Sequence, residues 1–490
     1  MRMSKSPPRM THNRAEMLLG AARRDWERIR PYARWLYYEM FPQRRPGYFK
    51  AAWNGPFYRL GGESLPTWPS SRSDRRVFLF FPLVDWHGRM QRSQHLATAL
   101  AELGHLCIYV NPHLGLEYEL PPLFSPEPRL SALAPGIFEL HVHLPAEHAI
   151  DARLLSCGEA EQVAVAVHDV LSELNVTHAV QIVSVPSWHH VVTTLRSTKG
   201  FPIVYDCHDF LPGFERMAQD ILDSEPPLFE TCDHVLFSAQ YLLDTVAASV
   251  PGIADKALVI RNANRPSDFA ATERPALCPL STVAYAGSLD HWFDVDLVAT
   301  AAARNPSLTF KLAGRIEDNR VRRLERFRNI CFLGEIPYSS VPTFLRSCDA
   351  AMIPFLRTPL TMSTNPIKMY EYFSVGLPVV SSRLPEVELY SHLVYIADSP
   401  EQFAGLIRQA VEERSSAARE RRIAAGKAET WCHRASMLLQ RVNESQKSLD
   451  ARLGIDQWAA RTSFAAESGS LQCASTKHCD LNRRGVFDEH

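Results

Sequence analysis

The sequence predicts an α/β protein with two domains, each built on a parallel β-sheet. Apolar strand segments alternate with amphipathic helix segments in both halves of the chain, and neither half contains a long stretch of strands alone. A chain of 490 residues with 46% hydrophobic content is also long enough to bury two separate cores. We therefore expect two Rossmann-like parallel-sheet domains that face each other across a cleft.

The alternating pattern places these domains at residues 73–266 and 275–428. Residues 1–72 precede them as a basic, amphipathic extension that is rich in aromatic side chains. Residues 429–456 read as helices that return toward the first domain. Residues 457–490 form a polar tail, and we expect it to be disordered because its few apolar residues cannot offset the entropy of ordering.

The charge distribution argues against nucleic acid as a partner. The formal net charge is -1, although the first 50 residues hold twelve Lys or Arg against four Asp or Glu. Within residues 14–41, apolar positions recur at helical spacing among arginines and aromatic residues. Such a segment can lie on an anionic membrane surface, or it can pack on the protein with its arginines in water.

The cysteine pattern indicates a reducing compartment. The ten cysteines are scattered through apolar segments without a C-x-x-C pair, which favours buried thiols over disulfides or a metal site. No window approaches the roughly 20 apolar residues of a membrane span, and the basic start lacks a signal-peptide core. We expect a cytoplasmic protein with no bound metal, and peripheral contact at the inner face of the cell membrane if residues 14–41 bind lipid.

In the first domain, two loops follow buried strands. The apolar strand RRVFLFFPLV precedes the loop DWHGRMQRS, which carries Gly88, Arg89 and Arg92. Ligands of open parallel sheets bind at the carboxyl ends of the strands, so this loop is a candidate for the cleft. The strand FPIVYDC ends in a second polar group that contains Asp206, His208 and Asp209. A buried strand rarely ends in several titratable residues unless the next loop faces a ligand.

In the second domain, the segment Ser363–Ser382 predicts a diphosphate site. Asn365 is a suitable N-cap, Gly376 can end the helix, and LPVVSS reads as a buried strand. The free N–H groups and the positive dipole at such a helix start favour a diphosphate, and Lys368 adds a charge. Glu371, one turn further, can accept hydrogen bonds from sugar hydroxyls. This local pattern alone is common in α/β proteins.

This segment resembles the donor-binding segment of GT-B glycosyltransferases, especially the family 4 type. That family has two glutamates eight positions apart before a G-x-P-V-V strand; Glu371 matches the second, which binds the ribose, and Ser363 replaces the first, which binds the donor sugar. GSLDHWFDVDL lacks the Arg and Lys that follow Gly287 in most relatives, and it resembles a bacterial subgroup that works on cell-surface polysaccharides. The resemblance covers roughly residues 77–445.

The resemblance also implies roles for single residues. VYDCHDF matches a V-x-x-H-D sequence, which implies that His208 lies over the donor sugar with Asp209 as its neighbour or as an alternative base. With Glu371 these form the catalytic set. The expected donor-binding residues are Gly88, Gly287, Arg315, Ile336, Ser363, Thr364, Asn365, Lys368 and Glu371. Those expected on the acceptor side are Arg89, Arg92 and Asp206.

The function implied is transfer of a sugar from a nucleotide sugar, a UDP- or GDP-sugar, to a glycan or lipid-linked acceptor in polysaccharide biosynthesis. No cofactor or metal is expected. The resemblance implies retention of the anomeric configuration; an inverting reaction would instead use Asp209 or Asp206 as the base. A catalytically silent GT-B scaffold and a sugar-nucleotide epimerase are the alternatives, the first because Ser363 and the missing Arg/Lys pair depart from the family.

Overall fold

The structure is a computed structural model that describes residues 57–59, 75–114, 129–142, 144, 148–270 and 281–453. The chain divides into two compact units, Met1–Ala435 and Ser436–His490, and both large β-sheets lie in the first unit. The predicted lipid-binding segment 14–41 and the tail 457–490 lie outside the described residues. Among the described helices, none combines the length and the apolar character needed to cross a lipid bilayer.

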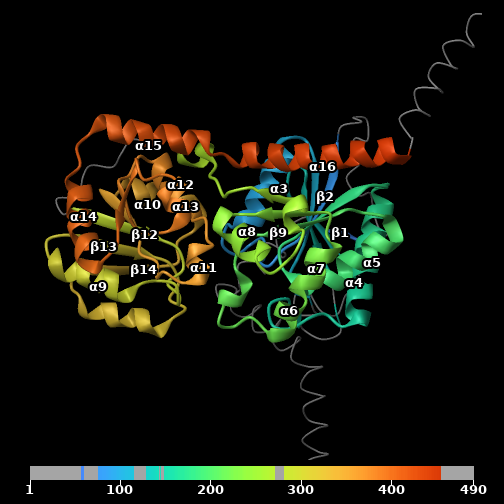
Figure 1. Cartoon of the computed structure of the whole chain (residues 1–490), viewed down its shortest axis with the longest axis horizontal. Coiled ribbons are helices and arrows are strands. Elements are labelled where there is room, and N and C mark those ends of the chain that lie inside the picture. The colour runs from blue at the N-terminus through green and yellow to red at the C-terminus, as the bar shows by residue number, and fades with distance from the viewer. Residues whose placement is uncertain are drawn as a thin grey trace, which may run out of the picture. The chain divides into compact units, whose positions relative to one another are not determined.

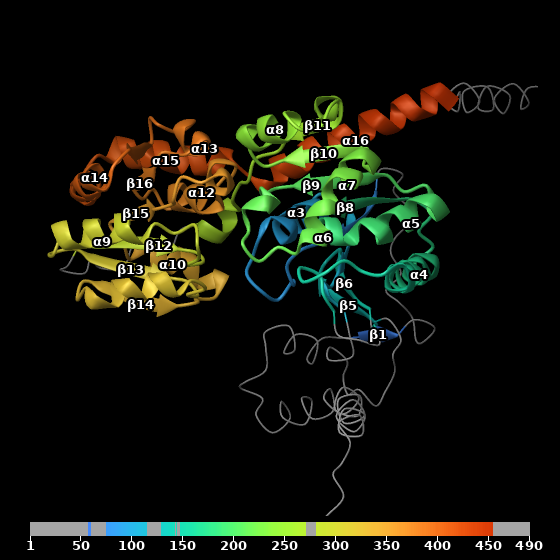
Figure 2. The same ribbon diagram turned by 60° about the horizontal axis from the view of Figure 1, so that its bottom comes forward.

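The first sheet has nine strands in the order β1-β5-β6-β3-β2-β8-β9-β10-β11. Figure 2 labels β1, β5, β6 and β8 to β11 in this order from bottom to top. The seven strands from β6 to β11 pair in parallel, as the sequence predicts. The strands are β1 (Phe57–Arg59), β2 (Val77–Phe81), β3 (Leu106–Val110), β5 (Arg129–Ala134), β6 (Ile137–His141), β8 (Ala179–Val183), β9 (Ile203–Cys207), β10 (His234–Phe237) and β11 (Ala257–Val259). β4 (His113–Leu114) and β7 (His148–Ala149) form a separate antiparallel pair.

One edge of the first sheet differs from the prediction. β5 pairs antiparallel with β6, and Gly136, with φ of 77°, lies in the tight turn that joins them. β1 then pairs antiparallel with β5, so residues 57–59 of the predicted extension belong to this sheet. Two antiparallel strands are therefore added at this edge of an otherwise parallel sheet, and one of them comes from the segment expected to precede the domain.

The second sheet is entirely parallel and has the strand order β14-β13-β12-β15-β16-β17. Figure 2 labels the strands from β14 to β16 in this order. Its strands are β12 (Thr282–Ala286), β13 (Thr309–Ala313), β14 (Ile330–Gly334), β15 (Ala350–Ile353), β16 (Val379–Ser382) and β17 (Val394–Ala397). β15 and β16 are buried along their whole length; β15 is entirely apolar, whereas β16 ends in Ser381 and Ser382, whose hydroxyls donate to backbone carbonyl oxygens.

Helices connect the parallel strands of both sheets (Figure 1). The α-helices are α3 (Arg92–Glu102), α4 (Cys157–Glu173), α5 (His189–Lys199), α6 (Gln219–Asp223), α7 (Glu225–Thr231), α8 (Gln240–Ala247), α9 (Val295–Arg304), α10 (Val341–Arg346), α11 (Pro359–Met362), α12 (Ile367–Ser374), α13 (Pro385–Glu388), α14 (Pro400–Glu412), α15 (Ser416–Ala428) and α16 (Trp431–Leu453). The 3₁₀ helices are η3 (Pro186–Trp188), η4 (Leu211–Gly213), η5 (Ile253–Lys256), η6 (Pro266–Phe269), η7 (Asn319–Arg326) and η8 (Tyr338–Ser340).

Each sheet has its own hydrophobic core. One cluster of buried apolar side chains runs from Val77 to Ile253, and another runs from Phe269 to Val411. The chain leaves the second core through α15, and Trp431 at the start of α16 stacks on His95 of α3 with ring centroids 5.0 Å apart. The first turn of α16 therefore contacts the first domain, which agrees with the predicted return of the chain.

Candidate functional site

The predicted diphosphate site is centred on α12. This helix begins at Ile367, ends before Gly376 in the left-handed conformation with φ of 75°, and leads into the buried strand β16. The predicted helix, its glycine stop and the following strand are confirmed. The first N–H groups of any helix lack acceptors within the helix, so the start of α12 can donate hydrogen bonds to an anion.

Lys368 lies against the end of β12. Its ammonium is 4.6 Å from the ring centroid of Phe355 and 5.4 Å from that of Tyr285, so two aromatic faces support the charge. Gly287 follows β12 with φ of 146°, and a Cβ at this glycine would lie 3.2 Å from Lys368 Nζ. Burial lowers the pKa of Lys368 to about 8. The structure thus brings two of the predicted donor residues, Gly287 and Lys368, together.

Glu371 lies three residues after Lys368, on the same face of α12. Its side chain is almost fully buried. Burial raises the pKa of Glu371 to about 7, while the positive charge of Lys368 acts in the opposite direction. A partly buried cation and a carboxylate of raised pKa on one helix face form a polar pair suited to a ligand that carries both phosphate and hydroxyl groups.

The residues just before α12 are not placed as predicted. The N-cap of α12 is Pro366 and not Asn365, and the side chains of Ser363 and Asn365 are buried. The Thr364 hydroxyl donates to the Leu360 carbonyl oxygen at 2.8 Å. Asn365 has hydrogen-bond partners within the protein, whereas Ser363 Oγ is buried without a partner among the described residues, so the predicted contact of Ser363 with a donor sugar stays a prediction.

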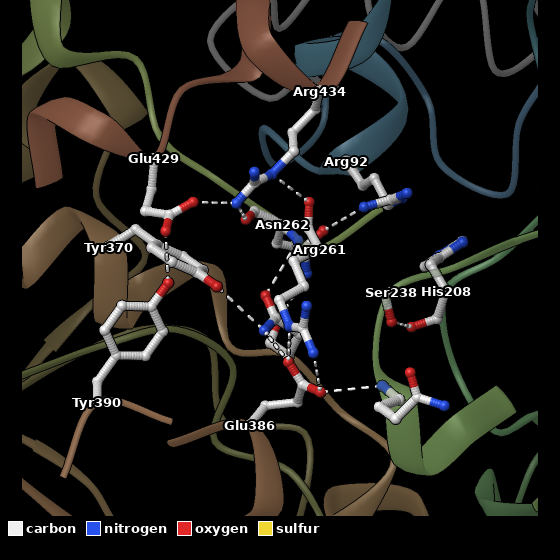
Figure 3. Close-up of polar contacts among 12 residues, drawn as sticks. Arg92, His208, Ser238, Arg261, Asn262, Tyr370, Glu386, Tyr390, Glu429 and Arg434 are labelled. Atoms are coloured by element: carbon white, nitrogen blue, oxygen red, sulfur yellow. Dashed lines mark hydrogen bonds and ion pairs between the residues drawn. The ribbon is translucent and has the colours of Figure 1, made fainter. Parts of the chain in front are cut away.

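Asn365 instead belongs to a buried hydrogen-bond network that links the two domains (Figure 3). Asn262, just after β11, donates from its backbone N–H to Asn365 Oδ1 at 3.0 Å and from its amide to the Asn365 carbonyl oxygen at 2.6 Å. Asn365 Nδ2 donates in turn to Glu386 at 2.8 Å. Glu386 also accepts from Arg261 at 2.7 Å and from the backbone N–H of Gln240 at 2.9 Å. One buried carboxylate therefore joins α8, the segment after β11 and the start of α13.

Arg92 and Asp206 form a buried ion pair, which contradicts their expected place on the acceptor side. Arg92 is the first residue of α3, and its Nε donates to Asp206 Oδ1 at 2.8 Å. Asp206 lies inside β9 and is completely buried. Arg92 also donates to Asn262 Oδ1 at 2.9 Å, which connects this pair to the Asn365 network (Figure 3). The pair therefore positions these segments of the protein.

His208 and Asp209 follow β9 and retain some exposure. His208 Nδ1 lies 2.9 Å from the carbonyl oxygen of Asp206, and its Nε2 lies 3.6 Å from Asp209 Oδ2. Ser238, after β10, donates to the His208 carbonyl oxygen at 2.7 Å, which fixes the loop (Figure 3). Burial raises the pKa of Asp209 above its usual range. Their predicted position in a loop after a strand is confirmed, and their catalytic roles stay predictions.

The loop after β2 contacts the second domain through Arg89. This guanidinium donates to Glu335 at 2.7 Å and to Glu317 at 3.1 Å. Arg315, which is largely exposed, donates to the same Glu317 at 2.5 Å. Arg315, predicted to bind the donor, and Arg89, predicted on the acceptor side, are thus both paired with carboxylates. They could reach an anion only by exchanging these partners.

Two further predicted donor residues lie in loops at the strand ends. Gly88 closes a tight turn by donating to the carbonyl oxygen of Asp85 at 3.2 Å. Ile336 follows β14 and packs at the edge of the second core. The Gly334 carbonyl oxygen, two residues earlier, accepts from the Gly314 N–H at 2.8 Å, which brings the ends of β13 and β14 together.

The seven described cysteines form no disulfide bond with one another. Cys157, Cys331 and Cys432 are exposed, so the expectation of burial was wrong for these three. Sequence analysis also missed Glu386 and the group Asp85, His87 and Glu139, whose side chains could hold a metal ion. Glu139 lies 52 positions from His87, and Glu386 lies 125 positions from Arg261, so no local pattern marks these contacts.

Comparison with known proteins finds similarity to glycosyltransferases. Residues 281–413 match the family described as glycosyl transferases group 1. Over 203 residues the chain is 23% identical to the putative teichuronic acid biosynthesis glycosyltransferase TuaH of Bacillus subtilis, covering 37% of this chain and 51% of TuaH. The matched part therefore spans about half the length of that relative.

Solved structures share the fold. Sucrose-phosphate synthase of Thermosynechococcus elongatus superposes with a TM-score of 0.60 at 14% identity, covering 76% of this chain and all of that protein. HepE of Anabaena, in complex with UDP and glucose, superposes with a TM-score of 0.50 at 14% identity, covering 76% and 99%. The predicted two-domain fold is confirmed. The chain has the GT-B fold of these structures, and its residues 281–413 are similar to the glycosyl transferases group 1 family.

Proposed function

We propose that this protein is a glycosyltransferase that moves a sugar from a nucleotide-sugar donor to an acceptor hydroxyl. The observation that carries the proposal is the pairing of Lys368 and Glu371 on one face of α12, with the backbone of Gly287 against the lysine. These three residues lie within the segment that matches the group 1 family. The family match therefore includes the residues proposed here to bind the donor: Gly287 and Lys368 at the phosphate, and Glu371 at a sugar or ribose hydroxyl.

The chemistry follows from the charge that develops on the leaving nucleoside diphosphate. Lys368 supplies a positive charge, and the first N–H groups of α12 supply hydrogen-bond donors in a fixed position. Because burial holds the pKa of Lys368 near 8, an incoming diphosphate favours its protonated form. Glu371 accepts hydrogen bonds from ribose hydroxyls when it is ionised, and this orients the donor.

His208 and Asp209 are the proposed residues beside the reacting sugar. They follow β9, and Ser238 holds their loop in place. With retention, His208 lies over the donor sugar; with inversion, Asp209 takes the proton of the acceptor hydroxyl. We propose retention. Asp206 does not serve as the base in this proposal, because Arg92 holds it in a buried ion pair.

The proposed donor is a UDP-sugar, with a GDP-sugar as the alternative. The Anabaena relative of the same fold was crystallised with UDP and glucose, which supports UDP. The acceptor we propose is a glycan or a lipid-linked glycan of a bacterial polysaccharide. The name of the Bacillus subtilis relative, which refers to teichuronic acid biosynthesis, supports this class of acceptor.

The test begins with binding and then measures turnover. Calorimetry with UDP and with GDP on the full chain should show binding of one of them at micromolar concentration. Lys368→Met and Glu371→Gln should each weaken that binding at least tenfold, which corresponds to about 1.4 kcal/mol. Lys427→Met and Glu420→Gln on α15 are matched controls, because both side chains are exposed and lie outside the site.

Turnover separates the proposed function from its alternatives. Release of free nucleoside diphosphate that requires an added glycan acceptor supports the transferase. Conversion of the sugar nucleotide into an isomer without release indicates an epimerase. Nucleotide binding without turnover on any polysaccharide or lipid-linked acceptor indicates a silent scaffold. The anomeric proton signal of the product in NMR spectra then distinguishes retention from inversion.

A further inference from the structure

A second group of chemically reactive side chains lies in the first domain, between the loop after β2 and the strand β6. Asp85 and His87 belong to the loop after β2, and Glu139 lies in β6. β3 is the strand between β2 and β6 in the sheet. One ligand atom from each of the three side chains lies within 4.8 Å of the others.

Both carboxylates of this group are removed from solvent. The side chain of Glu139 is 1% exposed and that of Asp85 is 7% exposed. Their ion pairs are made with histidines: Glu139 with His87 at 2.8 Å and with His141 at 3.1 Å, and Asp85 with His113 at 3.6 Å. Two carboxylates buried so close together require compensating positive charge.

The hydrogen bonds around the group leave one oxygen of each carboxylate directed toward the others. Asp85 Oδ1 accepts from the backbone N–H of His87 at 2.6 Å, whereas Asp85 Oδ2 is buried and accepts no hydrogen bond from the described residues. Glu139 Oε1 accepts from Asn111 Nδ2 at 2.7 Å. Glu139 Oε2 lies 2.8 Å from His87 Nε2 and 3.1 Å from His141 Nε2. Such outer hydrogen bonds are the ones that orient carboxylate ligands toward a bound ion.

We propose that Asp85, His87 and Glu139 bind a divalent transition-metal cation. Two carboxylate oxygens and one imidazole nitrogen form a mixed donor set that suits Zn²⁺ or Mn²⁺, whereas Ca²⁺ and Mg²⁺ prefer oxygen ligands alone. Two further imidazoles lie beside the group and can complete the coordination: His141 Nε2 is 3.1 Å from Glu139 Oε2, and His113 Nε2 is 3.6 Å from Asp85 Oδ2. The cation joins the loop after β2 to β6.

The consequence concerns the position of Arg89. The loop that begins at Asp85 continues to Arg89, which contacts Glu317 and Glu335 of the second domain. A cation bound at the start of this loop restrains the segment that carries Arg89. The metal is therefore a structural element of the first domain, and it is independent of the nucleotide site on α12.

The binding test uses the full chain, without a histidine tag, after treatment with EDTA and removal of the chelator. Calorimetry with ZnCl₂ and MnCl₂ in the absence of nucleotide should show one equivalent of at least one cation bound at micromolar concentration. Asp85→Asn and Glu139→Gln should each weaken binding at least tenfold. His168→Ala is the matched control, because His168 and Asp169 form an exposed pair at 3.3 Å. Unchanged affinity in Asp85→Asn and Glu139→Gln would overturn the proposal.

A second measurement does not depend on the folding of variants. Crystals of the wild-type chain soaked in ZnCl₂ should show an anomalous difference peak among Asp85, His87 and Glu139. A peak only at other histidines, or the absence of any peak at this position, would overturn the proposal. Since neither experiment contains a sugar nucleotide, failure of the metal site leaves the proposed transferase function unaffected.

Discussion

The backbone of Gly287 lies directly against the side chain of Lys368: a Cβ at position 287 would lie 3.0 Å from Lys368 Cε. Gly287 also has φ of 146°, a conformation that other residues rarely adopt. The Gly287→Ala substitution should therefore displace Lys368 and strain the turn after β12. We expect a loss of stability of about 1–3 kcal/mol and at least tenfold weaker binding of UDP or GDP. Thermal unfolding and calorimetry measure the two effects.

Gly405→Ala is the control for this prediction. Gly405 lies within α14, and a Cβ there would meet no atom within 4 Å. Alanine in a helix is more stable than glycine by up to about 1 kcal/mol, so this variant should be unchanged or slightly more stable. Equal nucleotide affinity in Gly287→Ala and the wild type would show that Lys368 does not depend on this contact.

Glu371 should make the stability of the protein depend on pH. Its pKa is about 7 in the folded protein, compared with 4.5 in an unfolded chain. Between these pH values the folded state holds a proton that the unfolded state has released, so the free energy of unfolding falls as pH rises through this window. Glu371→Gln removes this dependence. At pH 8 the variant should be more stable than the wild type by roughly 1 kcal/mol. The gain is smaller than the shift of the Glu371 pKa alone would give, because the substitution also removes the attraction between Lys368 and the Glu371 carboxylate.

Urea unfolding of the wild type and of Glu371→Gln at pH 4.5 and pH 8 tests this expectation. The two proteins should differ more at pH 8 than at pH 4.5. The same variant should bind nucleotide more weakly, so stability and binding move in opposite directions. A variant that is less stable at pH 8 and binds nucleotide normally would contradict both roles assigned to Glu371.

The ion pair of Arg92 and Asp206 should be important for folding. Both side chains are buried, so Asp206→Asn leaves the guanidinium without its charged partner. Breaking a buried pair on one side costs about 3–5 kcal/mol, and we expect a loss of this size in urea unfolding. Glu401→Gln is the control, because the pair of Arg304 and Glu401 is exposed and surface pairs contribute little. Similar small losses in both variants would contradict the positioning role.

Glu386 should couple the two domains. Glu386→Gln keeps the shape of the side chain but replaces one acceptor oxygen by an NH₂ group. That NH₂ group would lie against N–H donors, because both oxygens of Glu386 accept hydrogen bonds from Arg261, Asn365 or Gln240. Hydrogen bonds to a charged group are worth about 1.5–3 kcal/mol, so we expect a loss of stability in that range. Differential scanning calorimetry should also show a broader transition, or two transitions, if the domains unfold less cooperatively. The neighbouring, exposed Glu388→Gln should leave a single transition.

Local sequence signals were sufficient to predict most of the elements around the proposed site. The apolar runs became β2, β9, β12 and β16, and Gly376 ends α12 as expected. These features depend on side-chain periodicity and on the conformational freedom of glycine, which are properties of short segments. The antiparallel pairing of β5 with β6 and β1 was missed, because pairing partners are selected by the whole sheet.

The roles of single polar residues were harder to predict. Asparagine is a common N-cap residue, yet the side chain of Asn365 accepts a hydrogen bond from Asn262, which is 103 positions earlier in the chain. The sequence placed Arg92 and Asp206 in ligand-binding loops. In the structure Arg92 begins α3, Asp206 lies within β9, and the two side chains form an ion pair. Burial of a polar residue depends on its tertiary partner, and a single sequence does not reveal that partner.

The short strand β1 has a practical consequence for work with shortened chains. Residues 57–59 cover the outer side of β5, which would otherwise be the last strand of the sheet. An uncovered strand offers unpaired N–H and C=O groups to other molecules. A protein produced from residue 73 onward would expose β5 in this way and should aggregate through edge-to-edge association, so expression should begin upstream of Phe57.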